Sequence, residues 1–234
     1  MIPLPKPIPG RIAPRPKLAS TIVLVRNHKG ERQILMGKRS TRHDFMPSVY
    51  VFPGGRVDPA DTVAKAADHM NPRTRNILES AMPPARAHAC VMACIRETFE
   101  ETSVVLGHPT SEPPPPIRDP SWQEIYQRGF IPNIADIHVF ARAITPPFRN
   151  KRFDTWFFVT EITDNLPHQI PIASDELVDV GWFTLQQAKA LDIHRATEMM
   201  LAELEIFLGY DNPPNHIFFS RVKHQRFKFS RFPE

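Results

Sequence analysis

The feature that most constrains this chain is the charged run Arg-Glu-Thr-Phe-Glu-Glu at positions 96–101. Its carboxylates, Glu97, Glu100 and Glu101, have the spacing i, i+3 and i+4, so on an α-helix all three share one face. Like charges at this spacing destabilise a helix unless a cation offsets them. The run is therefore either a solvated acidic face or a site for a hard cation such as Mg²⁺ or Mn²⁺, which prefers oxygen ligands.

The residues around this run predict an amphipathic helix over 85–102. Pro83 and Pro84 precede it, and proline suits the first turn of a helix. The side opposite the glutamates carries Val91, Met92, Ile95, Phe99 and Thr102. The pattern thus predicts a helix that packs one face on a core and presents carboxylates on the other.

A strand and a glycine pair precede the helix. Residues 49–52, Val-Tyr-Val-Phe, are β-branched or aromatic and predict a strand. Gly54 and Gly55 are expected to end that strand and to open an acidic loop with Asp58 and Asp61. Glycine permits positive φ and close approach of the backbone to a ligand or metal. An ordinary turn explains the pair taken alone, but strand, glycine loop and carboxylate helix in this order favour a site.

In this order the residues resemble the signature of the Nudix hydrolase family, G-x5-E-x7-R-E-U-x-E-E-x-G-U, in which U is a bulky apolar residue. The positions that match are Gly55, Asp61, Arg96, Glu97, Glu100, Glu101 and Val104. Asp61 replaces a glutamate, Thr98 stands at an apolar position, and Ser103 replaces a glycine. Asp61 and Arg96 are separated by 34 residues where the signature has 7, so residues 62–88 are predicted to be an insertion.

An insertion at this point resembles a branch of the family, the peroxisomal coenzyme A diphosphatases. Segments 45–55 and 152–158 resemble the lead-in and a later strand of that branch. A different coenzyme A signature, found just before the glycine pair in other members, is absent. The chain also ends Phe-Pro-Glu rather than in a peroxisomal tripeptide.

The resemblance implies an α/β fold, a Nudix-type α/β/α sandwich with a mixed β-sheet and a helical insertion. The element pattern is compatible with it. Strands are expected at 21–26, 33–39, 137–144, 155–162 and 178–183, with a hairpin-like turn at 28–30 between the first two, and helices at 121–128, 185–191, where Thr184 can cap the start, and 194–208. We expect a proline-rich arm over 1–17, the Nudix domain over 18–208, and a basic C-terminal extension over 209–234.

The resemblance also implies roles for the signature residues. Glu97, Glu100 and Glu101, with the backbone of Gly55, would hold Mg²⁺ or Mn²⁺, which would neutralise a pyrophosphate and lower the pKa of the attacking water. Arg96 would orient the glutamates by ion pairing.

Other roles stay open at this point. The general base is Glu97 or Glu101, or else Asp175 or Glu176 from a distant loop. The candidates for phosphate contact are Gly54, Arg39 and Arg152, although structural ion pairs explain the two arginines equally well, and Asp154 is a partner for either.

The implied activity is divalent-metal-dependent hydrolysis of the pyrophosphate bond in a nucleoside diphosphate linked to another moiety. The branch suggests coenzyme A or acyl-CoA, and ADP-ribose and dinucleotides are alternatives. A catalytically inactive Nudix-fold binding module is a second class, but all three glutamates are present. An RNA-binding or decapping protein is a third, supported only by the basic aromatic run at 221–232. We expect a small-molecule substrate rather than nucleic acid, and a homodimer is compatible with the family.

Composition supports an enzyme with its own core. The chain has 234 residues, of which 41% are hydrophobic, and it lacks both an apolar stretch of about 18 residues and a signal-peptide core. Cys90 and Cys94 lie one helical turn apart without a second pair, so a zinc site is not predicted. Reduced core cysteines and a cytoplasmic location without membrane contact are the expectation.

Overall fold

The computed structural model describes residues 12–41, 47–163 and 167–233. Most of the predicted arm and the first residues of the 45–55 segment therefore lie outside the described residues. The strands are β1 (Lys17–His28), β2 (Glu31–Arg39), β3 (Tyr50–Val51), β4 (Gly54–Arg56), β5 (Gly107–Pro109), β6 (Phe130–Pro132), β7 (His138–Ile144), β8 (Phe153–Glu161), β9 (Leu177–Thr184), β10 (Ile217–Lys223) and β11 (Arg226–Phe232). The helices are α1 (Pro72–Glu79), α2 (Pro84–Thr102), α3 (Pro120–Gln127), α4 (Leu185–Ala190) and α5 (Arg195–Leu208), with short 3-10 helices η1 (Pro59–Thr62) and η2 (Pro167–Gln169).

A mixed nine-stranded sheet forms the middle layer of the molecule. Seven strands run in the order β11-β10-β7-β8-β1-β2-β3, while β4 pairs with β1 and β9 pairs with β2. β1 is parallel to β8 and antiparallel to β2 and β4. β5 and β6 form a separate two-stranded sheet. The mixed sheet predicted by the resemblance is confirmed.

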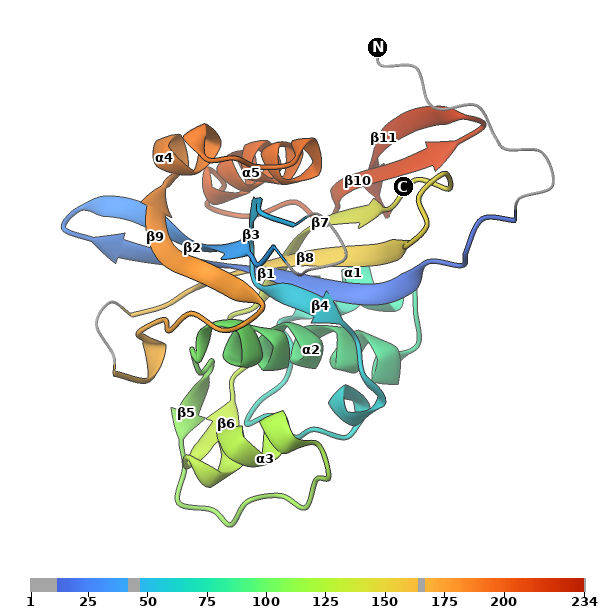
Figure 1. Cartoon of the computed structure of the whole chain (residues 1–234). Coiled ribbons are helices and arrows are strands. Elements are labelled where there is room, and N and C mark those ends of the chain that lie inside the picture. The colour runs from blue at the N-terminus through green and yellow to red at the C-terminus, as the bar shows by residue number, and fades with distance from the viewer. Residues whose placement is uncertain (1–11, 42–46, 164–166, 234) are drawn as a thin grey trace.

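Helices cover both faces of this sheet. Figure 1 shows α4 and α5 on one side and α1, α2 and α3 on the other. The central strand β1 is buried on both faces: Ile22 and Leu24 pack in the core beneath α2, and Val23 and Val25 pack in the core beneath α5. Successive residues of a strand point to opposite faces, so one continuous apolar run supplies both cores and holds α2 against the sheet.

Local signals placed most elements correctly. The predicted strands and helices all occur, with shifts of a few residues at their ends. Lys29 and Gly30 both have positive φ in the turn between β1 and β2, as a tight hairpin requires. Thr184 caps α4 by accepting a hydrogen bond from the Gln187 N–H.

Two predictions near the glycine pair need correction. The strand predicted over 49–52 is only the two-residue β3, and residues 54–56, predicted as loop, form β4. β1 explains the second difference, because its twelve residues extend past β2 and leave positions 19–21 free to pair with β4. The glycine pair is therefore held in the sheet rather than in a turn.

The C-terminal segment joins the main sheet. β10 pairs in parallel with β7, and β11 forms the edge by pairing with β10. Residues 209–234, predicted as an extension, thus contribute two strands to the same sheet. Within the described ranges, no helix is long and apolar enough to cross a bilayer.

Candidate active site

Helix α2 presents the three glutamates at the boundary between the core and solvent. Its opposite face, from Val91 to Phe99, is buried under the sheet. Glu101 is 5% exposed and belongs to the interior, Glu97 is partly buried, and Glu100 is exposed. The solvated acidic face considered from the sequence therefore describes Glu100 alone.

Arg96 connects the glutamates to η1. Its Nη1 lies 2.9 Å from Oε1 of Glu97 and donates to both carboxylate oxygens of Glu100 at 3.1 Å. Its Nε and Nη2 donate to the two oxygens of Asp61 at 2.8 and 3.1 Å, and Nη2 also donates to the carbonyl of Arg56. The guanidinium group thus fixes two glutamates relative to the strand that carries the glycines.

Asp61, the residue at the position of the first signature glutamate, contacts Arg96 rather than the glutamates. It is completely buried in η1 and accepts two further hydrogen bonds, from the Trp122 indole N–H and the Asp58 N–H. The sequence did not identify Trp122. Its only signal was a large aromatic residue in the predicted helix at 121–128, which does not reveal a partner 61 residues away.

The glycine pair packs against Glu97 and Glu101. The Gly54 N–H donates to Oε2 of Glu101 at 2.8 Å. A Cβ at Gly55 would lie 2.3 Å from Oε2 of Glu97, and a Cβ at Gly54 would lie 2.4 Å from the carbonyl oxygen of Ser20. A side chain at position 55 would overlap the Glu97 carboxylate, and one at position 54 would overlap β1, so glycine is required at position 55 for the approach of Glu97 and at position 54 for the pairing of β4 with β1.

Burial and crowding raise the pKa of two of these carboxylic acids. Burial, with repulsion from Glu100 and Asp61, raises the pKa of Glu97 to about 7 although Arg96 opposes the shift. Burial and the charges of Glu97 and Glu176 raise the pKa of Glu101 well above its usual range, while the Gly54 N–H and Arg39 oppose it. A bound cation would relieve this like-charge repulsion.

The donor set fits a hard divalent cation. In the described part of the chain no group of three acidic, histidine or cysteine side chains is already arranged around one point, because Arg96 engages Glu97 and Glu100. Glu97 and Glu101 nevertheless each keep one oxygen for further bonds. Arg96 contacts Oε1 of Glu97, and the Gly54 N–H donates to Oε2 of Glu101. The absence of a side chain at Gly55 lets the other oxygen of Glu97 lie close to the backbone of β4. Carboxylate and carbonyl oxygens are the ligands that Mg²⁺ and Mn²⁺ prefer.

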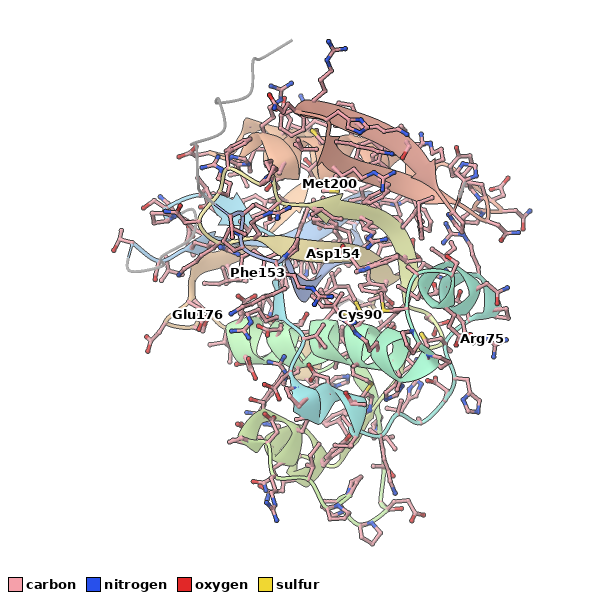
Figure 2. All side chains as sticks on the ribbon, turned by 90° about the vertical axis from the view of Figure 1, so that its right-hand side faces the viewer. Arg75, Cys90, Phe153, Asp154, Glu176 and Met200 are labelled. Carbon is pink, nitrogen blue, oxygen red and sulfur yellow. The ribbon has the colours of Figure 1, made fainter. Side chains whose placement is uncertain are left out.

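Arg39 and Glu176 lie beside this cluster. They end β2 and precede β9, which pair with each other, and the Ser40 N–H donates to the Glu176 carbonyl at 2.9 Å. Burial lowers the pKa of Arg39, and the charges of Glu101 and Glu176 partly offset that shift. Figure 2 shows Glu176 beside the carboxylate helix. The structure therefore brings Arg39, Glu101 and Glu176 into one electrostatic group.

Arg152 occupies a different place. It precedes β8, and its guanidinium group donates to the backbone carbonyls of Thr145 and Pro14. Asp154, suggested as a partner for Arg39 or Arg152, instead forms a two-bond ion pair with Arg142. This suggestion was wrong because β7 and β8 pair in a register that brings Arg142 and Asp154 close together.

The mixed sheet between helical layers, with the signature glutamates on α2 and the glycine pair on β4, defines a Nudix-type α/β protein. No family model matches the chain. The fold is that of the NUDIX hydrolase from Alicyclobacillus acidocaldarius, with a TM-score of 0.59 and 20% identity over 80% of this chain and 90% of that one. The NUDIX domain of Shewanella oneidensis NrtR, solved with ADP ribose, has a TM-score of 0.50 at 14% identity, covering 83% and 90%.

In sequence, the chain is similar to acyl-coenzyme A diphosphatases. It is 28% identical to NUDT19 of Homo sapiens over 206 residues, 67% of this chain and 54% of that protein. It is 26% identical to NUDT19 of Gallus gallus over 227 residues, 75% of this chain and 59% of that protein. The chain thus spans little more than half the length of these curated relatives. The resemblance to the coenzyme A diphosphatase branch is confirmed.

Proposed function

We propose that the chain is a divalent-metal-dependent hydrolase that cleaves the pyrophosphate bond of a nucleoside diphosphate linked to another moiety. One observation carries the proposal. Two carboxylic acids with raised pKa values, the partly buried Glu97 and the buried Glu101, lie against the glycine pair and are oriented by Arg96 and the Gly54 N–H. Burying several carboxylates together is costly unless a cation compensates them.

The metal we propose is Mg²⁺ or Mn²⁺, held by Glu97, Glu100 and Glu101 with the Gly55 backbone. When bound it would supply positive charge to the pyrophosphate and promote ionisation of the attacking water. The chain's own groups would set the geometry: Arg96 holds Glu97 and Glu100, and the Gly54 N–H holds Glu101.

Two further roles follow from the group beside β2 and β9. We propose that Arg39 contacts a substrate phosphate, because it is a partly buried cation whose charge couples to Glu101. Glu176 is our choice for the general base, since its charge couples to both Glu101 and Arg39. Arg152 has backbone carbonyls as partners, which favours a structural role over the phosphate contact considered from the sequence.

The substrate class we propose is coenzyme A or acyl-CoA, cut to a phosphopantetheine product and adenosine 3′,5′-bisphosphate. The similarity to acyl-coenzyme A diphosphatases supports it. A cytoplasmic location and a homodimer are further proposals. The first is supported by two buried free cysteines, Cys90 and Cys94, which suit a reducing compartment.

The test is a substrate panel with a matched pair of variants. Coenzyme A, acyl-CoA, ADP-ribose, NADH and dinucleoside polyphosphates are incubated with Mg²⁺ or Mn²⁺, and products are identified by mass. Glu101→Gln should abolish metal-dependent turnover while keeping the fold, because it preserves volume and hydrogen bonding but removes a charged ligand. Glu112→Gln, at an exposed position in the loop after β5, is the control. Cleavage of no diphosphate by the wild type would refute the proposal, as would full activity of Glu101→Gln.

A further inference from the structure

We propose that Trp122 is a positioning residue for the glutamates of α2, acting through Asp61 and Arg96. Its indole N–H fixes the Asp61 carboxylate, which fixes the Arg96 guanidinium group, which holds Glu97 and Glu100. The catalytic side of this inference rests on the proposed function. Helix α3, which lies outside the signature, thereby orients the glutamates of α2.

The hydrogen bonds of Asp61 are fully accounted for. Oδ1 accepts from Nε of Arg96 at 2.8 Å and from Nε1 of Trp122 at 3.0 Å. Oδ2 accepts from Nη2 of Arg96 at 3.1 Å and from the Asp58 N–H at 2.7 Å. Each oxygen thus has two donors, and the side chain is completely buried. Such a carboxylate has no capacity left for a metal, so its role is to orient Arg96.

The orientation of Arg96 determines where the carboxylates of Glu97 and Glu100 lie. Asp61 and the Arg56 carbonyl occupy Nε and Nη2, which leaves Nη1 to engage Glu97 and Glu100. If Asp61 rotated, the guanidinium group would rotate with it, and Glu97 and Glu100 would lose the ion pairs with Nη1 that orient them. Mutation of a residue such as Arg96, which hydrogen-bonds directly to the proposed ligands, typically changes metal affinity by about 10- to 100-fold.

Trp122 also explains why position 61 carries aspartate rather than the glutamate of the signature. The signature has glutamate there, and aspartate is shorter by one methylene group. Asp61 and Trp122 are both 0% exposed, and Oδ1 of Asp61 already lies 3.0 Å from Nε1 of Trp122, so a side chain longer by one methylene group would overlap the indole ring. The indole N–H reaches the shorter carboxylate from α3 and supplies a fixed donor on its far side. Asp61 and Trp122 therefore form a matched pair that replaces a single glutamate.

Helix α3 provides an internal control for this proposal. Trp122 and Tyr126 stack with ring centroids 5.9 Å apart, one turn apart on the same helix. The Tyr126 hydroxyl donates to the Lys65 carbonyl and accepts from its N–H. Removing that hydroxyl disturbs the attachment of α3 to the insertion without touching Asp61. A general loss of α3 packing can thus be separated from loss of the Trp122–Asp61 bond.

The experiment measures Mn²⁺ affinity without substrate, from the electron paramagnetic resonance signal of free Mn²⁺. Trp122→Phe acts through Asp61 and Arg96, so it should weaken binding about 10-fold, the lower end of the range expected for Arg96, whereas Tyr126→Phe should stay within about twofold of the wild type. Asp61→Glu should also weaken binding, because the extra methylene group overpacks the site beside Trp122. The double variant Asp61→Glu/Trp122→Phe should bind about fivefold more tightly than either single variant, since the smaller ring admits the longer carboxylate. Circular dichroism verifies that each variant is folded.

Several results would overturn the proposal. Wild-type affinity in folded Trp122→Phe would remove Trp122 from the metal site, and equal losses in Trp122→Phe and Tyr126→Phe would make the effect general packing. If Trp122→Phe does not fold, the test uses the double variant Asp61→Glu/Trp122→Phe. A folded double variant that binds Mn²⁺ no more tightly than Asp61→Glu would also overturn the proposal. Failure of the wild type to bind Mn²⁺ would refute this inference and the metal site together. Normal binding without hydrolysis of any diphosphate would count against the proposed function alone.

Discussion

Gly55→Ala tests the contact between the glycine pair and the carboxylate helix. A Cβ built at Gly55 lies 2.3 Å from Oε2, 2.4 Å from Cδ and 2.6 Å from Oε1 of Glu97, where ordinary contact begins at 3.4 Å. The shortfall of about 1 Å falls on the end of a flexible side chain, so the Glu97 carboxylate moves and the fold stays. A displacement of about 1 Å in a catalytic group costs about 10²-fold in rate, which is about 2.7 kcal/mol of activation free energy.

The assay is the initial rate of metal-dependent diphosphate cleavage at saturating Mn²⁺, together with Mn²⁺ affinity in the absence of substrate. Gly181→Ala is the matched control, because a Cβ there meets only Phe183 at 3.4 Å, an ordinary contact. We expect Gly181→Ala to stay within about twofold of the wild type. Urea unfolding should show that Gly55→Ala loses less than about 1 kcal/mol of stability. A folded Gly55→Ala with wild-type rate and Mn²⁺ affinity would refute the assigned geometry.

Three further changes test the surroundings of the site. Ser103 ends α2 with φ of +58°, where the signature has glycine, so Ser103→Gly should raise the free energy of unfolding in urea by about 0.5–1 kcal/mol; a decrease would contradict the strain. The free energy of unfolding of the metal-free protein should fall as pH rises from about 4.5 to 7, because the folded state holds a proton on Glu97 that the unfolded state has released. Glu97→Gln should make the free energy of unfolding depend less on pH in this range, and an unchanged pH dependence would contradict the raised pKa of Glu97. Glu176→Gln should lower kcat by about 10²-fold or more, whereas Asp175→Asn should not, and equal small effects would return the role of base to a signature glutamate.

Part of this site was predictable because its signals are local. The carboxylates of α2 share a face through the helical repeat, and the apolar face opposite them predicts which side is buried. The hairpin turn at Lys29 and the cap at Thr184 likewise depend on residues two or three positions away. Periodicity and capping report such neighbours directly, so the sequence alone was sufficient for them.

Other parts depended on sheet register. The pairing of β4 with β1 sets the position of Gly54, whose N–H meets Glu101 47 residues further along the chain. The pairing of β9 with β2 brings Glu176 beside Arg39. From the sequence, Asp175 and Glu176 were equal candidates for the general base, and Arg39 and Arg152 were equal candidates for phosphate contact. Composition does not encode which strands become neighbours, so it could not separate them.

The sequence by itself determined the class of site: a carboxylate helix and a glycine pair that together suit a hard cation. The tertiary structure decided how that site is built. It buried Asp61 under Trp122, turned the aspartate into a support for Arg96, and placed Arg152 and Asp154 in other contacts. The physical reason is that ligand chemistry is carried by residue type and short spacing, whereas the orientation of each ligand depends on partners that only packing brings together.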